Sequence, residues 1–318
     1  MNQTSPLCSA RVWGPVLLLL ALGLPFVAKG YQIFQATMVL SYAISLLGLN
    51  ILTGYNGQIS LGHGAFYALG AYTTGMLMEH AGMPYWLTIP CAALVCLVVG
   101  YLFGRPALKL EGLYLALATF ALGVAMPQLL KYKHLEAWTG GVTGIVLMKP
   151  DAPFGLPLSQ DQWLYFFALL VAAVMFWIAH NLLASGTGRA IRAIRDHSMA
   201  AEAMGVDNRH YKSMSFGVSA AYTGVGGALS AIAVQFVSPD SFTLFLSISL
   251  LVGIVVGGVG TLWGALWGAA FIMFVPNLAE KVSKAAPWAV YGLVLIAFMF
   301  VMPGGVVGLL RKLQAKFK

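Results

Sequence analysis

The chain has 318 residues, of which 59% are hydrophobic and only 9% are charged. Because soluble domains carry roughly a quarter charged residues, this composition excludes a soluble fold and indicates an all-α, polytopic bundle of transmembrane helices. The net charge of +8 would suggest nucleic-acid binding in a soluble protein, but in a membrane protein an excess of Lys and Arg in cytoplasmic loops explains it better. We treat residues 1–318 as a single transmembrane domain.

The hydrophobic segments predict ten spans, since one span needs about 20 mainly apolar residues. In chain order the predicted spans cover residues 12–28, 31–53, 54–78, 84–104, 112–130, 162–184, 213–237, 242–256, 262–278 and 287–302. The count falls to eight or nine if the glycine-rich breaks at Gly54 and Gly257 begin re-entrant segments. We interpret residues 12–28 as a span rather than a signal peptide, because no typical cleavage site ends it and another span begins at Tyr31.

The distribution of positive charge predicts the orientation. With ten spans and the N-terminus inside, 12 of the 18 Lys and Arg residues fall on the inner side and the other 6 on the outer side. By the positive-inside rule both termini are then cytoplasmic. The inner side also receives residues 185–212 and the basic tail, residues 306–318, whereas the long polar connection formed by residues 131–161 is extracytoplasmic.

The longest markedly polar run, residues 188–205, reads GRAIRAIRDHSMAAEAMG. Three arginines recur every three residues and share one face of a predicted helix, whereas Ile191 and Ile194 fall on the opposite face. Either Asp196 or Ser198 can cap a second short helix, which Gly205 ends in a left-handed conformation. The candidate partner-binding residues are Gly188, Arg189, Arg192, Arg195, Asp196, Ala200, Ala201, Glu202, Ala203, Met204 and Gly205.

Two functions are compatible with this polar run. In one, it is a solvated loop whose arginines enforce topology or meet anionic lipid headgroups. In the other, it docks into a groove of a partner protein, which accounts for its small apolar surface, its caps and its basic flank together. We favour docking, because topology alone does not require a capped second helix.

A second polar cluster lies within a glycine-dense stretch at membrane depth. Its members are Asn50, Asn56, Gln58, Ser60 and His63. They either bond across packed helices or line a substrate path, because polar groups at this depth face protein or water rather than lipid. His63 is better explained as a packing residue than as a proton relay. The glycines expected to pack or break helices are Gly54, Gly57, Gly62, Gly64, Gly70, Gly257, Gly258, Gly260 and Gly264.

The motifs that are missing narrow the function. The chain contains no Gly-Lys dipeptide, so it has no P-loop with which to bind and hydrolyse ATP itself. Metalloprotease, serine-hydrolase and paired-cysteine motifs are absent as well, and we expect no catalytic residue, metal or cofactor. Glu79, His80 and Glu111 fall at predicted helix ends, which leaves no carboxylate near mid-membrane for ion coupling. An external energy source is therefore favoured over an enzyme or a secondary transporter.

The motifs resemble those of a known family. The sequence AEAMG at residues 201–205, after the basic run, resembles the cytoplasmic "EAA" loop of ABC importer permeases. Three further stretches resemble branched-chain amino acid permease subunits of the LivM type: GYNGQISLGHGAF at residues 54–66, TGGVTG at 139–144 and GGVGTLWG at 257–264. The resemblance runs from about Tyr31 to Gly305. Urea and short-chain amide permeases share these patterns, so the substrate stays open.

This resemblance implies a half-channel in a bacterial inner membrane. Such a permease pairs with a homologous second permease, two cytoplasmic ATPase subunits that use the ATP, and an extracytoplasmic binding protein. Residues 200–205 would be the coupling helix seated in an ATPase groove, and residues 131–161 would receive the binding protein. The order Glu202-Ala203-Met204 departs from the common Glu-Ala-Ala order, which leaves the groove contacts open. A self-sufficient channel or secondary transporter is the alternative from another class.

Overall fold

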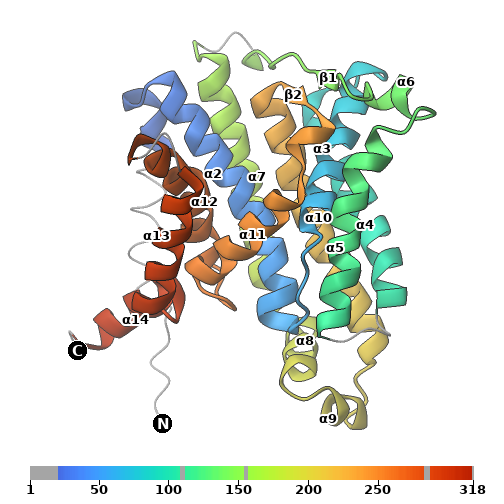
Figure 1. Ribbon diagram of the computed structural model, residues 1–318, viewed down its shortest axis with the longest axis vertical. Coiled ribbons are helices and arrows are strands. Elements are labelled where there is room, and N and C mark those ends of the chain that lie inside the picture. The colour runs from blue at the N-terminus through green and yellow to red at the C-terminus, as the bar shows by residue number, and fades with distance from the viewer. Residues whose placement is uncertain (1–20, 108–111, 154–156, 283–286, 317–318) are drawn as a thin grey trace.

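A computed structural model describes residues 21–107, 112–153, 157–282 and 287–316 (Figure 1). The predicted all-α fold is confirmed; among these residues, two strands of two residues each are the β structure. The helices are α2 (Gly30–Asn50), the π-helix η1 (Ile51–Tyr55), α3 (His63–Glu79), α4 (Tyr85–Ala107), α5 (Leu113–Leu130), α6 (Glu136–Thr139), α7 (Gln160–Ala184), α8 (Gly186–Asp196), α9 (Ser198–Ala203), α10 (Asn208–Val234), the 3-10 helix η3 (Pro239–Ser241), α11 (Leu244–Gly257), α12 (Gly264–Val282), α13 (Pro287–Val301) and α14 (Gly305–Lys316).

Helices α2 and α10 form the centre of the bundle. Helix α10 packs against α2, α3 and α4, and α2 also packs against α7 and α12. Small residues allow these contacts: a Cβ added at Gly70 of α3 would lie 2.1 Å from the carbonyl oxygen of Gly224 in α10. Such backbone-to-backbone packing is how helices associate in lipid, where the hydrophobic effect does not drive them together. The two central helices therefore fix the positions of everything described below.

The number of spans is the least certain part of the sequence prediction. In the part of the chain that the structure describes, seven helices are long and apolar enough to cross a membrane. They cover residues 30–55, 85–106, 113–130, 160–184, 208–234, 239–257 and 291–310. Helices α3 and α12, at the positions of two further predicted spans, are outside this set. Of the first predicted span, residues 12–20 lie outside the described residues and residues 21–27 are helical. The count of ten therefore stays a prediction.

Two helices begin five or more residues away from the start of the predicted span. The span predicted from Gly54 begins its helix only at His63, because Gly57 adopts a left-handed φ of 76° and residues 57–62 are not helical. Helix α10 begins at Asn208, five residues before the predicted span. There the Asp207 carboxylate accepts hydrogen bonds from the backbone N–H groups of Arg209 and His210, an N-cap that a search for apolar residues overlooks.

The ends of the bundle carry different elements. Strands β1 (Ile145–Val146) and β2 (Phe236–Val237) pair antiparallel and attach the connection of residues 131–161 to the end of α10. These strands and α6 lie at one end, whereas α8, α9 and α14 lie toward the other (Figure 1). The connection and the α8–α9 loop are thus at opposite ends of the molecule. Which end faces the cytoplasm stays a prediction.

Candidate functional site

Helix α8 is amphipathic and folds back onto the end of α7. Ile191 and Ile194 face the protein and are buried, with 1% and 4% of their surfaces exposed. Gly188 allows the close approach, since an added Cβ there would lie 2.3 Å from the carbonyl oxygen of Leu183. The helix is therefore anchored by its apolar face, as the spacing of its isoleucines predicts.

Helix α9 has the predicted end but a different start. Gly205 adopts a φ of 85°, and the N–H of Val206 donates to the carbonyl oxygen of Ala201 at 3.0 Å, which is a Schellman ending. The sequence predicted Asp196 or Ser198 as the N-cap of α9. The structure instead has His197 there, whose Nδ1 accepts from the N–H of Ala200 at 3.3 Å. Asp196 is still the last residue of α8, and its carboxylate accepts from Arg195, whereas Ser198 is already the first residue of α9.

Helix α9 presents apolar side chains to the exterior. Met199 and Met204 are 73% and 85% exposed, and Glu202 lies exposed between them, where its Oε2 accepts from Nδ2 of Asn208 at 3.2 Å. Asn208 also donates to the carbonyl oxygen of Ser198 at 2.8 Å, which fixes α9 to the start of α10. Met199 was missed by the sequence argument, because a methionine outside the motif carries no local signal of its own.

Two of the three arginines bind this chain rather than projecting outward. Arg192 donates to the carbonyl oxygens of Gly188 and Leu183 at 2.9 and 2.8 Å, so it satisfies backbone acceptors on both sides of the junction between α7 and α8. Arg195 donates from Nη1 to the carbonyl oxygen of Gly54 at 2.9 Å and from Nη2 to Asp196 at 2.8 Å. Arg189 is exposed. The three side chains therefore have different environments, although their spacing places them on one helix face.

The two glycine-rich breaks are joined by Asn50. Its Nδ2 donates to the carbonyl oxygen of Thr261 at 2.7 Å, and its Oδ1 accepts from the N–H of Gly260 at 2.8 Å. Gly54 packs against the same turn, because an added Cβ there would lie 2.5 Å from the nitrogen of Gly260. Both ends of the Asn50 amide are thus bonded within the protein, which fits the packing interpretation.

His63 and Ser60 are also bonded within the protein. Oγ of Ser219 donates to the carbonyl oxygen of Gly48 at 2.7 Å and lies 2.7 Å from Nε2 of His63. Since the hydroxyl has one proton, Nε2 carries the hydrogen and donates to Ser219. Nδ1 of His63 then accepts from Oγ of Ser60, 2.8 Å away. This neutral, fully buried imidazole fits the packing interpretation of the sequence.

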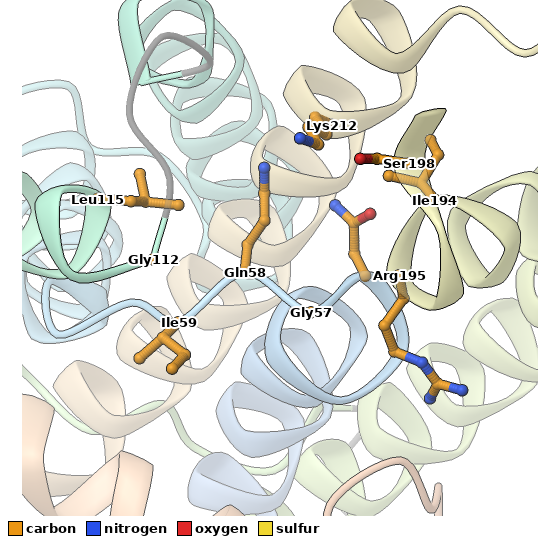
Figure 2. Close-up of a pocket in the computed structure, with 10 residues that line it drawn as sticks. Gly57, Gln58, Ile59, Gly112, Leu115, Ile194, Arg195, Ser198 and Lys212 are labelled. Carbon is orange, nitrogen blue, oxygen red and sulfur yellow. The ribbon is translucent and has the colours of Figure 1, made fainter. Parts of the chain in front are cut away.

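Asn56 and Gln58 differ from the other predicted path residues. Asn56 is 3% exposed, and among the described residues neither of its side-chain polar atoms, nor Oε1 of Gln58, has a hydrogen-bond partner. Both residues line a cavity of about 160 Å³. In Figure 2, Gly112 and Leu115 lie on one side of Gln58, and Ile194, Arg195 and Ser198 lie on the other. The cavity is therefore open on one side and lined partly by the helix break and partly by the α8–α9 loop.

The predicted glycines occupy tight contacts or left-handed turns. Gly258 and Gly260 have φ values of 119° and 74°. An added Cβ would lie within 3.0 Å of a neighbouring atom at Gly54, Gly57, Gly62, Gly64, Gly70, Gly257 and Gly264. The Gly64 N–H also donates to Oγ of Ser247 at 2.9 Å, which joins the first turns of α3 and α11.

A second cavity, of about 250 Å³, lies at the start of α11. Hydroxyl groups of Tyr42, Ser241, Thr243 and Ser249 occur in its lining, together with apolar side chains such as Leu246. None of the predicted path residues contributes to it. Sequence reasoning missed this group, because single serines and threonines in apolar helices are common and bond to their own backbone.

The region that carries both helix breaks and the α8–α9 loop matches a known family. A sequence model described as "Branched-chain amino acid transport system / permease component" matches residues 31–302. The chain belongs to this family. The LivM-type resemblance of the motifs is thereby confirmed, and with it a multi-pass membrane permease of the ABC transporter class.

Individual relatives agree with this assignment. The chain is 32% identical over 325 residues to "High-affinity branched-chain amino acid transport system permease protein LivM" of Escherichia coli (strain K12), covering 95% of this chain and 76% of that protein. Identity to the protein named LivH in the same system of the same strain is 22% over 314 residues, covering 87% and 94%. A probable LivM of Methanocaldococcus jannaschii is 23% identical over 236 residues, covering 64% and 67%. No solved structure gives a significant match.

Proposed function

We propose that this chain is one permease subunit of an ATP-driven importer and forms half of the translocation path for leucine, isoleucine and valine. Its family and its relatives are permeases of branched-chain amino acid transport systems. The high-affinity system of E. coli K12 includes two related permease proteins, named LivM and LivH, and this chain is similar to both. A homologous second permease is therefore the first partner that we assign.

The exposed apolar surface of the α8–α9 loop is the observation that supports an ATPase partner as the energy source. It is fixed to the bundle by Ile191 and Ile194 while Met199 and Met204 are exposed. Leaving two methionine side chains in water costs free energy that docking against an apolar groove would recover. We assign this groove to a cytoplasmic ATPase subunit, one of two in the complex, which hydrolyses the ATP. The permease itself uses no cofactor and catalyses no reaction.

The opposite end of the bundle is the proposed receptor for the extracytoplasmic binding protein. Pairing of β1 with β2 and an ion pair between Lys131 and Asp240 at 2.5 Å attach the described residues 131–153 of the connection to the bundle. Val142 and Met148 within it are 65% and 87% exposed. An ordered surface with exposed apolar side chains favours protein docking over a solvated linker. We accordingly assign α8–α9 and both termini to the cytoplasm of a bacterial cell whose inner membrane holds the complex.

The second cavity is the proposed contact point for the solute. It combines hydroxyl groups with apolar side chains, of which Leu246 is one, and an aliphatic amino acid in its zwitterionic form needs both kinds of surface. Among the residues that line this cavity, some come from α2 and others from the region around the start of α11. The predicted path residues Asn56 and Gln58 lie instead in the cavity beside the α8–α9 loop.

Uptake of labelled leucine into cells that carry the complete gene set tests the substrate class. Excess isoleucine or valine is expected to compete with leucine, and excess urea or acetamide is not. Competition by urea or acetamide, without competition by valine, would instead establish a urea or amide importer, whose permeases share the sequence motifs.

A further inference from the structure

Arg195 connects the α8–α9 loop to the helix break inside the bundle. Its Nη1 donates to the carbonyl oxygen of Gly54, and its aliphatic part lies across Gly57, where an added Cβ would be 2.9 Å from Cγ of Arg195. Asp196 accepts from Nε and Nη2 of the same guanidinium. The orientation of the guanidinium is thus set from both sides, by a carboxylate on its own helix and by a carbonyl of the break.

The π-helix η1, which contains Gly54 and leads into the non-helical residues 57–62, is itself bound to the second break. Asn50 bonds to the backbone of Gly260 and Thr261, and Gly54 packs against Gly260. A displacement of α8 would therefore pass through Arg195 to Gly54 and from there to the turn between α11 and α12. Irregular backbone of this kind can move without rupturing a regular helix, which makes it a suitable hinge.

The cavity beside Arg195 is lined by polar groups that could form hydrogen bonds after such a movement. Both polar atoms of the Asn56 side chain and Oε1 of Gln58 are buried without a hydrogen-bond partner among the described residues. An unpaired buried amide costs free energy. If the α8–α9 loop moves away from the break, water or solute can reach these buried amides and bond to them. An arrangement with the loop displaced would thus compensate for its lost contacts by hydrating Asn56 and Gln58.

We propose that Arg195 is the positioning residue that transmits movement of the α8–α9 loop to the helix break, and that its bond to Gly54 keeps the Asn56 side chain buried at the wall of the cavity. This inference rests on the proposed function, because it takes the movement of the loop from the ATPase docked there. It changes the role of Arg195 from a contact with the ATPase to a link within the permease.

The first test compares Arg195→Ala with Arg209→Ala in the complete transporter, purified and reconstituted in liposomes. Both variants remove one positive charge from the same end of the molecule, and Arg209 is likewise exposed. For Arg195→Ala we expect normal recovery of the ATPases and normal ATP hydrolysis, but about tenfold less uptake per ATP, a typical size for coupling between sites. Arg209→Ala is expected to match the wild type. Unchanged uptake per ATP, or loss of the ATPases from the Arg195→Ala complex, would overturn the proposal.

The second test follows the cavity directly. Asn56→Cys places a thiol where the native side chain has no hydrogen bond to lose and is 3% exposed, so it is expected to be unreactive toward a polar maleimide at rest. Trapping with ATP and vanadate is expected to make it reactive with Arg195 present, and to have little effect in the Arg195→Ala background. Buried Cys96 serves as the internal control. Equal responses in both backgrounds would refute the link, whereas failure of the wild-type chain to recover any ATPase would refute the proposed function instead.

Discussion

Asn50 offers the sharpest test of how the two helix breaks are held together. Asn50→Ala removes two hydrogen bonds, to Thr261 O at 2.7 Å and from Gly260 N at 2.8 Å. Side-chain hydrogen bonds between membrane helices average about 0.6 kcal/mol each, and the stranded carbonyl and N–H add about 1 kcal/mol each at the lower end of the range. Because Gly260 and Thr261 are half-buried, the lower end applies, and the expected loss is about 3 kcal/mol.

The assay is reversible unfolding of the purified chain in mixed micelles, with the free energy of unfolding compared between variants. Ser45→Ala on the same helix is the matched control, because Ser45 is equally buried but its hydroxyl donates only to Ser41 O within α2. We expect the control to lose no more than about 1 kcal/mol. Asn50→Asp keeps the shape but presents an acceptor to the Thr261 carbonyl, so it should be as harmful as Asn50→Ala. If Asn50→Ala and Ser45→Ala had the same effect, the two breaks would not be joined through this amide.

Three further predictions address the loop, the breaks and the two ends. Gly205→Ala places a Cβ on a residue with a φ of 85° and open space around it, so the cost is backbone strain of about 1 kcal/mol, and uptake per ATP should fall. Gly82→Ala, with a φ of 59° just after α3, should be equally strained yet leave uptake per ATP unchanged. Gly54→Ala brings a Cβ to 2.1 Å from Oδ1 of Asn50 and should destabilise the chain by about 2 kcal/mol, whereas Gly30→Ala, whose Cβ would have its nearest neighbour at 3.5 Å, should be tolerated in the same unfolding assay. Met199→Asp with Met204→Asp should abolish co-purification of the ATPases but not capture of the binding protein, and Val142→Asp with Met148→Asp should do the reverse; loss of both partners in either variant would contradict the assignment of the two ends.

Local signals in the sequence were enough for the shape of the α8–α9 loop. The isoleucine spacing and the glycine at position 205 depend on neighbours within a few residues, and the structure agrees with both. His197 as the N-cap was missed, because residue preferences rank Asp and Ser above His, while α8 extends to Asp196 and α9 begins at Ser198, which leaves His197 between them. The start of α10 was missed because its first turns are polar.

Contacts between distant segments could not be predicted in the same way. Arg195 bonds to a carbonyl 141 positions away, and Asn50 to an N–H 210 positions away. Nothing in the local pattern distinguishes these side chains from their neighbours, since Arg189, Arg192 and Arg195 have the same spacing and only the tertiary fold separates their roles. The late start of α3 has the same origin, because residues 57–62 are held by contacts such as Thr119 Oγ1 with the N–H of Leu61.

Leucine transport by purified components tests the central claim most directly. The wild-type chain is reconstituted in liposomes alone, and then with the second permease, the two ATPases and the binding protein, each with and without ATP. We expect leucine uptake only from the complete set with ATP, because the chain has no P-loop and the exposed Met199 and Met204 lie on the loop assigned to the ATPase. Uptake by the chain alone, independent of ATP, would contradict the account.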